Sequence, residues 1–187
     1  MHNHDKISET ILKSYHEKKM ITDLEEFIKH FHGQRRRTQW IVDAIPEEKA
    51  DWRPWPGEPS SAEIIRKIAA GHLMYATAVA HNYWTVDDYE SERFTWEESV
   101  EYFQKKTEEA LELLRPLSNS VLQEKRRRPD DNIPMTAWRY VAAMLDHEIH
   151  HRAQLMSYLM LLDIRRPNMG GITIEAVRAL LEEDTRK

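Results

Sequence analysis

Apolar residues recur at every third or fourth position along four long stretches of the chain, and no stretch alternates with the two-residue period of a strand. In the first stretch, over about residues 21–45, the periodic apolar positions are Leu24, Phe27, Ile28, Phe31, Ile41 and Ile45. Pro46 follows at once, and the proline-rich segment 52–59 cannot continue a helix. The pattern predicts a helix over 21–45 and then an irregular connector.

Two capping signatures mark where the next helices begin. Ser60 stands three residues before Glu63, and Thr95 stands three residues before Glu98, which is the spacing of a capping box. A basic loop at 125–134 precedes the last long periodic stretch. The predicted helices are residues 60–84, 95–117 and 135–162, with a short helix from about residue 173.

Four long helices joined by two substantial connections are typical of an all-α fold, an antiparallel four-helix bundle. At 187 residues the chain is long enough for one domain with a real apolar core. We expect residues 21–187 to form this domain, with residues 1–20 as a short N-terminal extension and the last short helix as a C-terminal one.

Composition narrows the classes of function. The chain has no cysteine, which excludes disulfides, cysteine-ligated zinc and a cysteine nucleophile. A net charge of −5 argues against nucleic acid as the partner. No apolar run approaches a membrane span, and the polar N-terminus lacks the apolar core of a signal peptide. We expect a cytoplasmic protein that binds neither nucleic acid nor membrane.

The last long helix contains the pattern H-E-x-x-H, in which two histidines four residues apart share one helix face and can reach one metal ion. The two histidines follow the apolar stripe of that helix: Met144, His147, His151, Leu155, Tyr158 and Leu162. Imidazoles that enter a bundle interior need polar partners. A metal is one such partner, and carbonyl or side-chain groups on facing helices are the other.

A zinc protease of the H-E-x-x-H class is the first function to weigh. The metzincin pattern continues with glycine and histidine, but the corresponding positions hold Gln154 and Ser157. An all-helical chain also lacks the edge strand that holds an extended peptide substrate. A metallohydrolase of this kind is therefore a remote alternative.

Two blocks of sequence resemble the DinB family. Residues 145–155 (LDHEIHHRAQL), followed by Tyr158-Leu159 and by the segment 164–167, resemble the C-terminal signature of that family. The segment 52–68 resembles its W-x-P…P-G…S-x-x-E-I block. The two blocks keep consistent spacing, and the resemblance spans about residues 22–170.

The resemblance implies a four-helix bundle, commonly a homodimer, with a divalent metal held by three histidines. Two of these match His147 and His151, but the third position holds Lys67. A lysine ammonium is a poor ligand and repels a cation. His72 points inward and could replace the missing ligand, although it lies about 7.5 Å further along the helix. The alternatives are weak binding by the two histidines with water or a carboxylate, and loss of the metal.

If metal is bound, nitrogen ligands with open positions suit Zn, Ni or Fe, and such a metal lowers the pKa of bound water or thiol. Characterised relatives include transferases that use low-molecular-weight thiols, so the resemblance implies a thiol S-transferase with a small-molecule substrate. Glu148 and Arg152, which flank the histidines, are the candidate catalytic residues. The competing hypothesis is a non-catalytic homodimer with a degenerate metal site.

Overall fold

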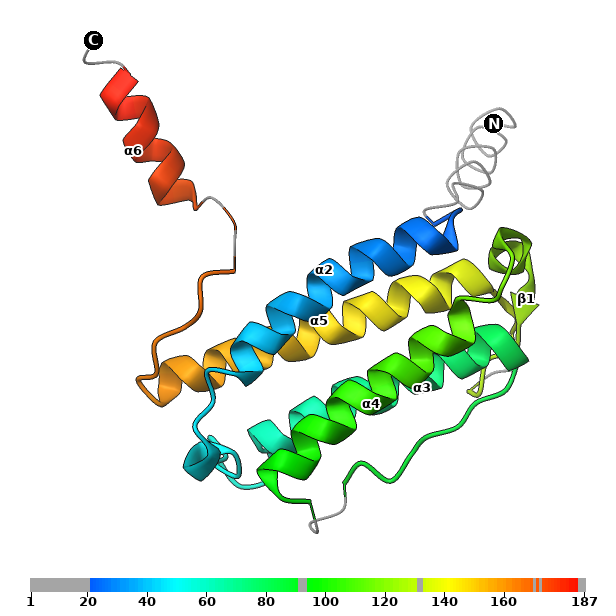
Figure 1. Ribbon diagram of the computed structural model, residues 1–187, viewed down its shortest axis with the longest axis horizontal. Helices are drawn as coiled ribbons and strands as arrows, with labels where there is room; N and C mark the ends of the chain where they lie inside the picture. The colour runs from blue at the N-terminus through cyan, green and yellow to red at the C-terminus, as the bar shows by residue number, and fades with distance from the viewer. Residues whose placement is uncertain (1–20, 91–93, 131–132, 170, 172, 185–187) are drawn as a thin grey trace, which may run out of the picture.

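The structure is a computed structural model that describes residues 21–90, 94–130, 133–169, 171 and 173–184 (Figure 1). The predicted N-terminal extension, residues 1–20, lies outside the described residues. The four bundle helices are α2 (Leu24–Val42), α3 (Ser61–His81), α4 (Trp96–Leu114) and α5 (Ala137–Leu161), and α6 (Ile174–Asp184) follows them. Each lies within about three residues of its predicted bounds, which confirms the four-helix bundle.

Short elements connect these helices. The 3₁₀ turns η1 (Glu47–Lys49) and η2 (Asn119–Gln123) follow α2 and α4. The strands β1 (Lys125–Arg126) and β2 (Met135–Thr136), which the sequence did not predict, pair antiparallel just before α5. Both predicted capping boxes are present, from Ser60 at the start of α3 and from Thr95 at the start of α4.

The apolar core is divided into two clusters, one at each end of the bundle. The first cluster joins the start of α2 and of α5 to the ends of α3 and α4. The second joins the ends of α2 and α5 to the first half of α3 and to Phe103 of α4. Hence α2 and α5 run in one direction, while α3 and α4 run in the other (Figure 1). The parallel pair α3 and α4 requires the long crossover at 82–95.

Between the two clusters each bundle helix contributes one polar residue with at most 4% of its surface exposed. These residues are Thr38 on α2, His72 on α3, Thr107 on α4 and Glu148 on α5. Within each helix the residue lies between the positions that enter the first cluster and those that enter the second. We call these four residues the polar layer. It crosses the middle of an otherwise apolar core.

Helix α6 stands apart from the bundle, and the segment from Leu162 to Thr173 leads to it (Figure 1). The C-terminal helix is thus confirmed as an extension. None of the described helices is both long enough and apolar enough to cross a membrane.

Candidate functional site

Glu148, the glutamate of the H-E-x-x-H pattern, lies in the polar layer with no exposed surface. It accepts a hydrogen bond from the Thr38 hydroxyl, and its Oε2 lies 3.3 Å from His72 Nε2, at ion-pair distance. Neither His72 Nε2 nor Glu148 Oε2 makes a hydrogen bond within the described part of the chain. The other ring nitrogen of His72, Nδ1, lies 3.0 Å from Thr107 Oγ1, and the Thr107 hydroxyl itself donates to the Phe103 carbonyl. Both nitrogens of His72 therefore face acceptors.

The electrostatics of the polar layer favour an ionised Glu148. Burial raises the pKa of this carboxyl, but His72, Thr38 and the positive charge of Arg35 together bring it below its ordinary value. Arg35 stacks on Phe103 with its guanidinium carbon 3.4 Å from the ring centroid. Burial lowers the pKa of Arg35 to about 10, against the opposing effect of Glu148. Glu148 thus ties α5 to α2 and α3 inside the core, out of reach of a substrate.

His147 lies on the other side of α5, against the backbone of α3. Its Nε2 lies 3.1 Å from the Lys67 carbonyl oxygen, to which it donates. The ring rests on Gly71, where an added Cβ would come within 2.3 Å of Nε2. Only glycine permits this approach without a shift of the ring. The sequence interpretation missed Gly71 because its requirement comes from a neighbouring helix.

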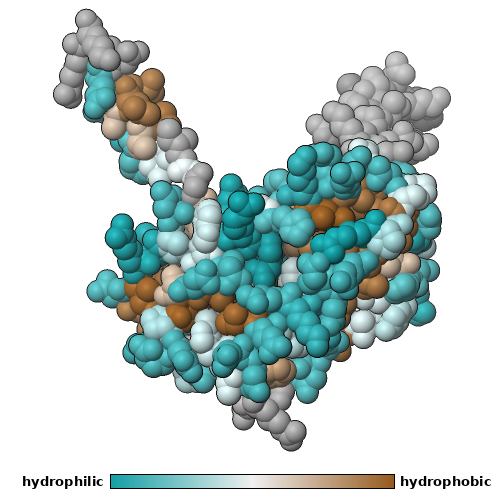
Figure 2. Space-filling view, in the orientation of Figure 1, coloured by the Kyte–Doolittle hydropathy of each residue, from teal (hydrophilic) through white to brown (hydrophobic). Residues whose placement is uncertain are grey.

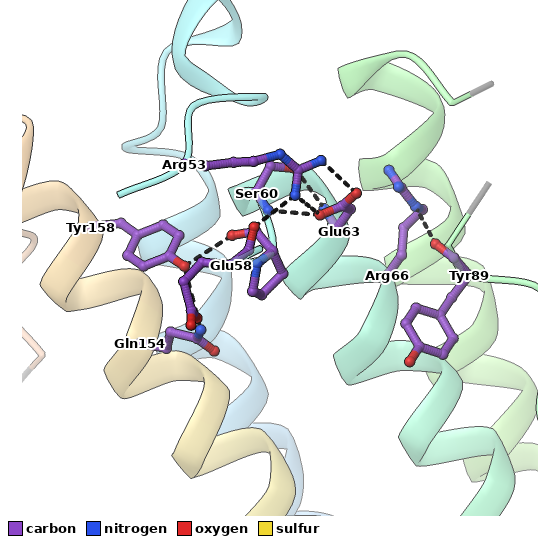
Figure 3. A network of polar contacts seen from close by, with 9 residues as sticks. Arg53, Glu58, Ser60, Glu63, Arg66, Tyr89, Gln154 and Tyr158 are labelled. Atoms are coloured by element: carbon purple, nitrogen blue, oxygen red, sulfur yellow. Dashed lines mark hydrogen bonds and ion pairs between the residues drawn. The ribbon is translucent and has the colours of Figure 1, made fainter. Parts of the chain in front are cut away.

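His151 lies one turn further along, with its ring centroid 4.6 Å from that of His147. Its Nδ1 is 3.0 Å from Gln154 Oε1. Gln154 Nε2 is 3.4 Å from the Tyr158 hydroxyl, which donates to the Pro59 carbonyl (Figure 3). This series of hydrogen bonds links the His151 ring to the proline-rich connector. It leaves Nε2 of His151 as the nitrogen that can accept.

Both histidines are poor bases in this environment. Burial, together with the charges of neighbouring histidines and of Lys67, lowers the pKa of His147 to about 4, against the opposing effect of the bond to the Lys67 carbonyl. Burial also lowers the pKa of His151, and the charge of Lys67 adds to this effect, against the bond to Gln154. At neutral pH the structure therefore presents two neutral imidazoles beside one ammonium.

Lys67 occupies the place that the resemblance assigned to the third histidine. Its side chain is half-buried, and within the described part of the chain its ammonium makes no hydrogen bond or ion pair. It lines a cleft of about 540 Å³ between the proline-rich connector, α3 and the crossover. The other residues of the cleft are Arg53, Gly57, Glu58, Pro59, Glu63, Tyr89 and Glu90.

One wall of this cleft is pinned by Arg53, whose guanidinium donates to both carboxylate oxygens of Glu63 at 2.5 and 2.7 Å and to the Glu58 carbonyl at 2.8 Å (Figure 3). The hydrogen bonds from Arg53 lower the pKa of Glu63, against its partial burial. Glu63 also closes the capping box of α3. These bonds fix the connector to the start of α3 and so hold this wall of the cleft in place.

The predicted metal ligands were His72, His147 and His151, and the structure brings only the last two together. His72 is engaged by Thr107 and Glu148 in the polar layer. Over the described ranges, no group of three histidine, aspartate or glutamate side chains is arranged to hold a metal ion. A pair of imidazoles beside an ammonium does not fit a three-ligand metal centre.

Arg152, the other predicted catalytic residue, is directed to α2. Its guanidinium donates to the carbonyl and the side-chain oxygen of Gln34, at 3.1 and 3.0 Å. Burial lowers its pKa, against the charge of Glu148. Arg152 therefore joins α5 to α2.

These features define a class of protein, a four-helix bundle with a long crossover between parallel helices and a histidine pair on its last bundle helix. Residues 30–155 match the model of the DinB superfamily, and the chain belongs to that superfamily. No curated protein matches the chain.

Solved structures share the fold. A DinB-like protein from Bacillus cereus is 15% identical, with 80% of this chain and 99% of that chain covered and a TM-score of 0.69. A DinB-like protein from Bacillus subtilis is 17% identical, covering 77% and 96%, with a TM-score of 0.63. YfiT from Bacillus subtilis, described as a probable metal-dependent hydrolase with an unusual four-helix bundle topology, is 14% identical, covering 76% and 89%, with a TM-score of 0.61. At these identities the likeness concerns the fold.

Proposed function

We propose that this DinB-superfamily protein binds a small polar molecule in the cleft beside Lys67 and works without a transition-metal centre. The observation that carries the proposal is the Lys67 ammonium, half-buried and without a polar partner among the described residues, next to two neutral histidines. A half-buried cation is stabilised by an anion that pairs with it through charge-assisted hydrogen bonds. An anionic group of a ligand provides this pairing.

The charges around the cleft indicate the chemical class of the ligand. The Arg53 guanidinium is bound to Glu63, which leaves Lys67 as the cation and Glu58 and Glu90 as the further carboxylates that line the cleft. A small zwitterion, with a carboxylate for Lys67 and an ammonium for Glu58, satisfies both groups. Tyr89 is a further polar residue that lines this cleft. We place this activity in the cytoplasm.

Three matched probes test the proposal: alanine, N-acetylalanine without the ammonium, and alaninamide without the carboxylate. Ligand-observed NMR should detect alanine best, and Lys67→Gln should remove its advantage over alaninamide. Glu58→Gln should remove its advantage over N-acetylalanine, and chelator treatment should change nothing. Equal binding of all three probes by the native protein and by Lys67→Gln would contradict the proposal.

A metal-dependent thiol S-transferase is the second candidate, and the retained pair His147 and His151, 4.6 Å apart, favours it. The description of YfiT as probably metal-dependent points the same way. With Zn, Ni or Fe supplied, this function requires turnover of a low-molecular-weight thiol and an electrophile. Turnover that a chelator abolishes and that His151→Ala lacks would favour this candidate over ours.

A further inference from the structure

A second cleft, of about 290 Å³, opens between α2 and α4. Both helices face the viewer in Figure 1, and the surface over them in Figure 2 is largely hydrophilic. Helix α2 contributes Arg35 and Arg36 to the lining, and α4 contributes Gln104 and Glu108. We call this space the α2–α4 cleft. Its polar lining raises the question of which ligand it fits.

Arg35 brings to this cleft a guanidinium group that is held in place but has few partners. The stack on Phe103, with 3.4 Å from the guanidinium carbon to the ring centroid, fixes its position. A guanidinium has five N–H donors. Within the described residues Arg35 makes one hydrogen bond, from Nη1 to Gln39 Oε1 at 3.3 Å, and its Nε is buried without a partner. Donors therefore remain for a bound oxyanion.

The charges along the cleft favour an anion. Burial lowers the pKa of Arg35 to about 10, against the effects of Glu148 and Asp43, so its guanidinium is charged at neutral pH. Arg36 is exposed, and it makes no hydrogen bond or ion pair within the part of the chain that the structure describes. Glu108 is the one carboxylate among the described residues that line the cleft, and Arg115 donates to it at 2.6 Å. The cleft therefore carries an excess of positive charge.

We propose that the α2–α4 cleft binds the phosphate group of a small molecule. Guanidinium groups bind phosphate through two parallel N–H···O bonds, and a phosphate offers more acceptor oxygens and more charge than a carboxylate. The donors of Arg35 and Arg36 on one wall and the Gln104 amide on the other suit such a group. A volume of about 290 Å³ is near the lower limit for a ligand pocket, so the rest of the molecule is small. The Lys67 cleft shares no residue with this one, so the two sites are separate.

A titration of the full chain with inorganic phosphate, followed by ³¹P NMR at an ionic strength held constant with sodium chloride, tests the proposal. The native protein should bind phosphate saturably, and an equal concentration of acetate should displace little of it. Arg36→Gln should weaken binding by roughly tenfold or more, because charge-assisted hydrogen bonds are lost. Circular dichroism should show the native helix content for this variant, because Arg36 is exposed.

Arg37→Gln is the matched control, from the next position of the same helix. Arg37 donates to Gln34 Oε1 at 3.4 Å and does not line the cleft, so this variant should bind phosphate within about twofold of the native protein. The absence of saturable binding, an equal loss in Arg36→Gln and Arg37→Gln, or equal competition by acetate would overturn the proposal. Loss of binding in Lys67→Gln, with Arg36→Gln unaffected, would move the anion to the Lys67 cleft and also contradict it.

Discussion

The polar layer makes a sharp prediction about Glu148, the residue that the H-E-x-x-H pattern suggests as a catalytic base. Its carboxylate has no exposed surface, accepts from Thr38 and faces His72 at 3.3 Å. Glu148→Gln keeps the size of the side chain but removes its charge. We expect the variant to lose stability, because Arg35 then loses the anion that opposes the effect of its burial, and His72 loses its carboxylate neighbour.

The magnitude follows from these contacts. Removing one partner of a buried ion pair costs about 3–5 kcal/mol. The glutamine oxygen can still accept from Thr38, and a hydrogen bond to a charged group is worth about 1.5–3 kcal/mol. We therefore expect Glu148→Gln to lower the free energy of unfolding by about 2–4 kcal/mol, with a fall in Tm of about 4–16 °C for a chain of this size. A double-mutant cycle with His72→Asn should give a coupling of about 1–3 kcal/mol.

Urea unfolding followed by circular dichroism measures this loss. Glu101→Gln, on the exposed face of α4, is the control and should stay within about 0.5 kcal/mol of the native protein. If Glu148→Gln unfolds at the native urea concentration, Glu148 has no role in holding the helices together. The argument from the polar layer would then be refuted.

Two further predictions concern the surroundings of His147. Gly71→Ala should destabilise the fold by about 1–3 kcal/mol, because the new Cβ would meet the His147 ring. Gly33→Ala is the control, and it should stabilise the fold by about 0.4–1 kcal/mol, because nothing lies within 4 Å of its new Cβ. Equal effects of the two substitutions in thermal unfolding would contradict this prediction. His147 has a pKa of about 4 in the folded protein and 6.5 as a free side chain, so the unfolded chain binds the proton first. Stability should be complete above pH 6.5 and fall by about 2 kcal/mol as the pH falls to 4, allowing for partial exposure. His147→Gln should lack this part of the loss, and superimposable stability curves for the two proteins would disprove the assignment.

The bundle was predictable from the sequence because its signals are local. Apolar periodicity gave the helices, and Ser60 and Thr95 marked two of their starts. The inward position of His147, His151 and His72 also followed from periodicity. The residues that these histidines contact could not be predicted from periodicity, because the rotation and stagger of neighbouring helices decide what a side chain meets. Thus His72 faces inward as expected but meets Glu148 and Thr107.

The other features of the site also depend on contacts between elements, which local sequence patterns do not determine. Lys67 was found as a departure from the family pattern, but its cleft is formed by the connector and the crossover, which carry no periodic signal. The parallel course of α3 and α4 depends on the crossover at 82–95, and loop sequence does not fix direction. The need for Gly71 arises only where the His147 ring crosses α3.

The central claim is that the Lys67 ammonium takes the place of a third metal ligand beside His147 and His151. Elemental analysis of protein purified without a histidine tag, after incubation with zinc and desalting, tests it most directly. The native protein should retain far less than one zinc ion per chain, while Lys67→His should retain close to one, and Lys67→His/His151→Ala should lose it again. Stoichiometric zinc in the native protein, lost in His151→Ala, would contradict the account.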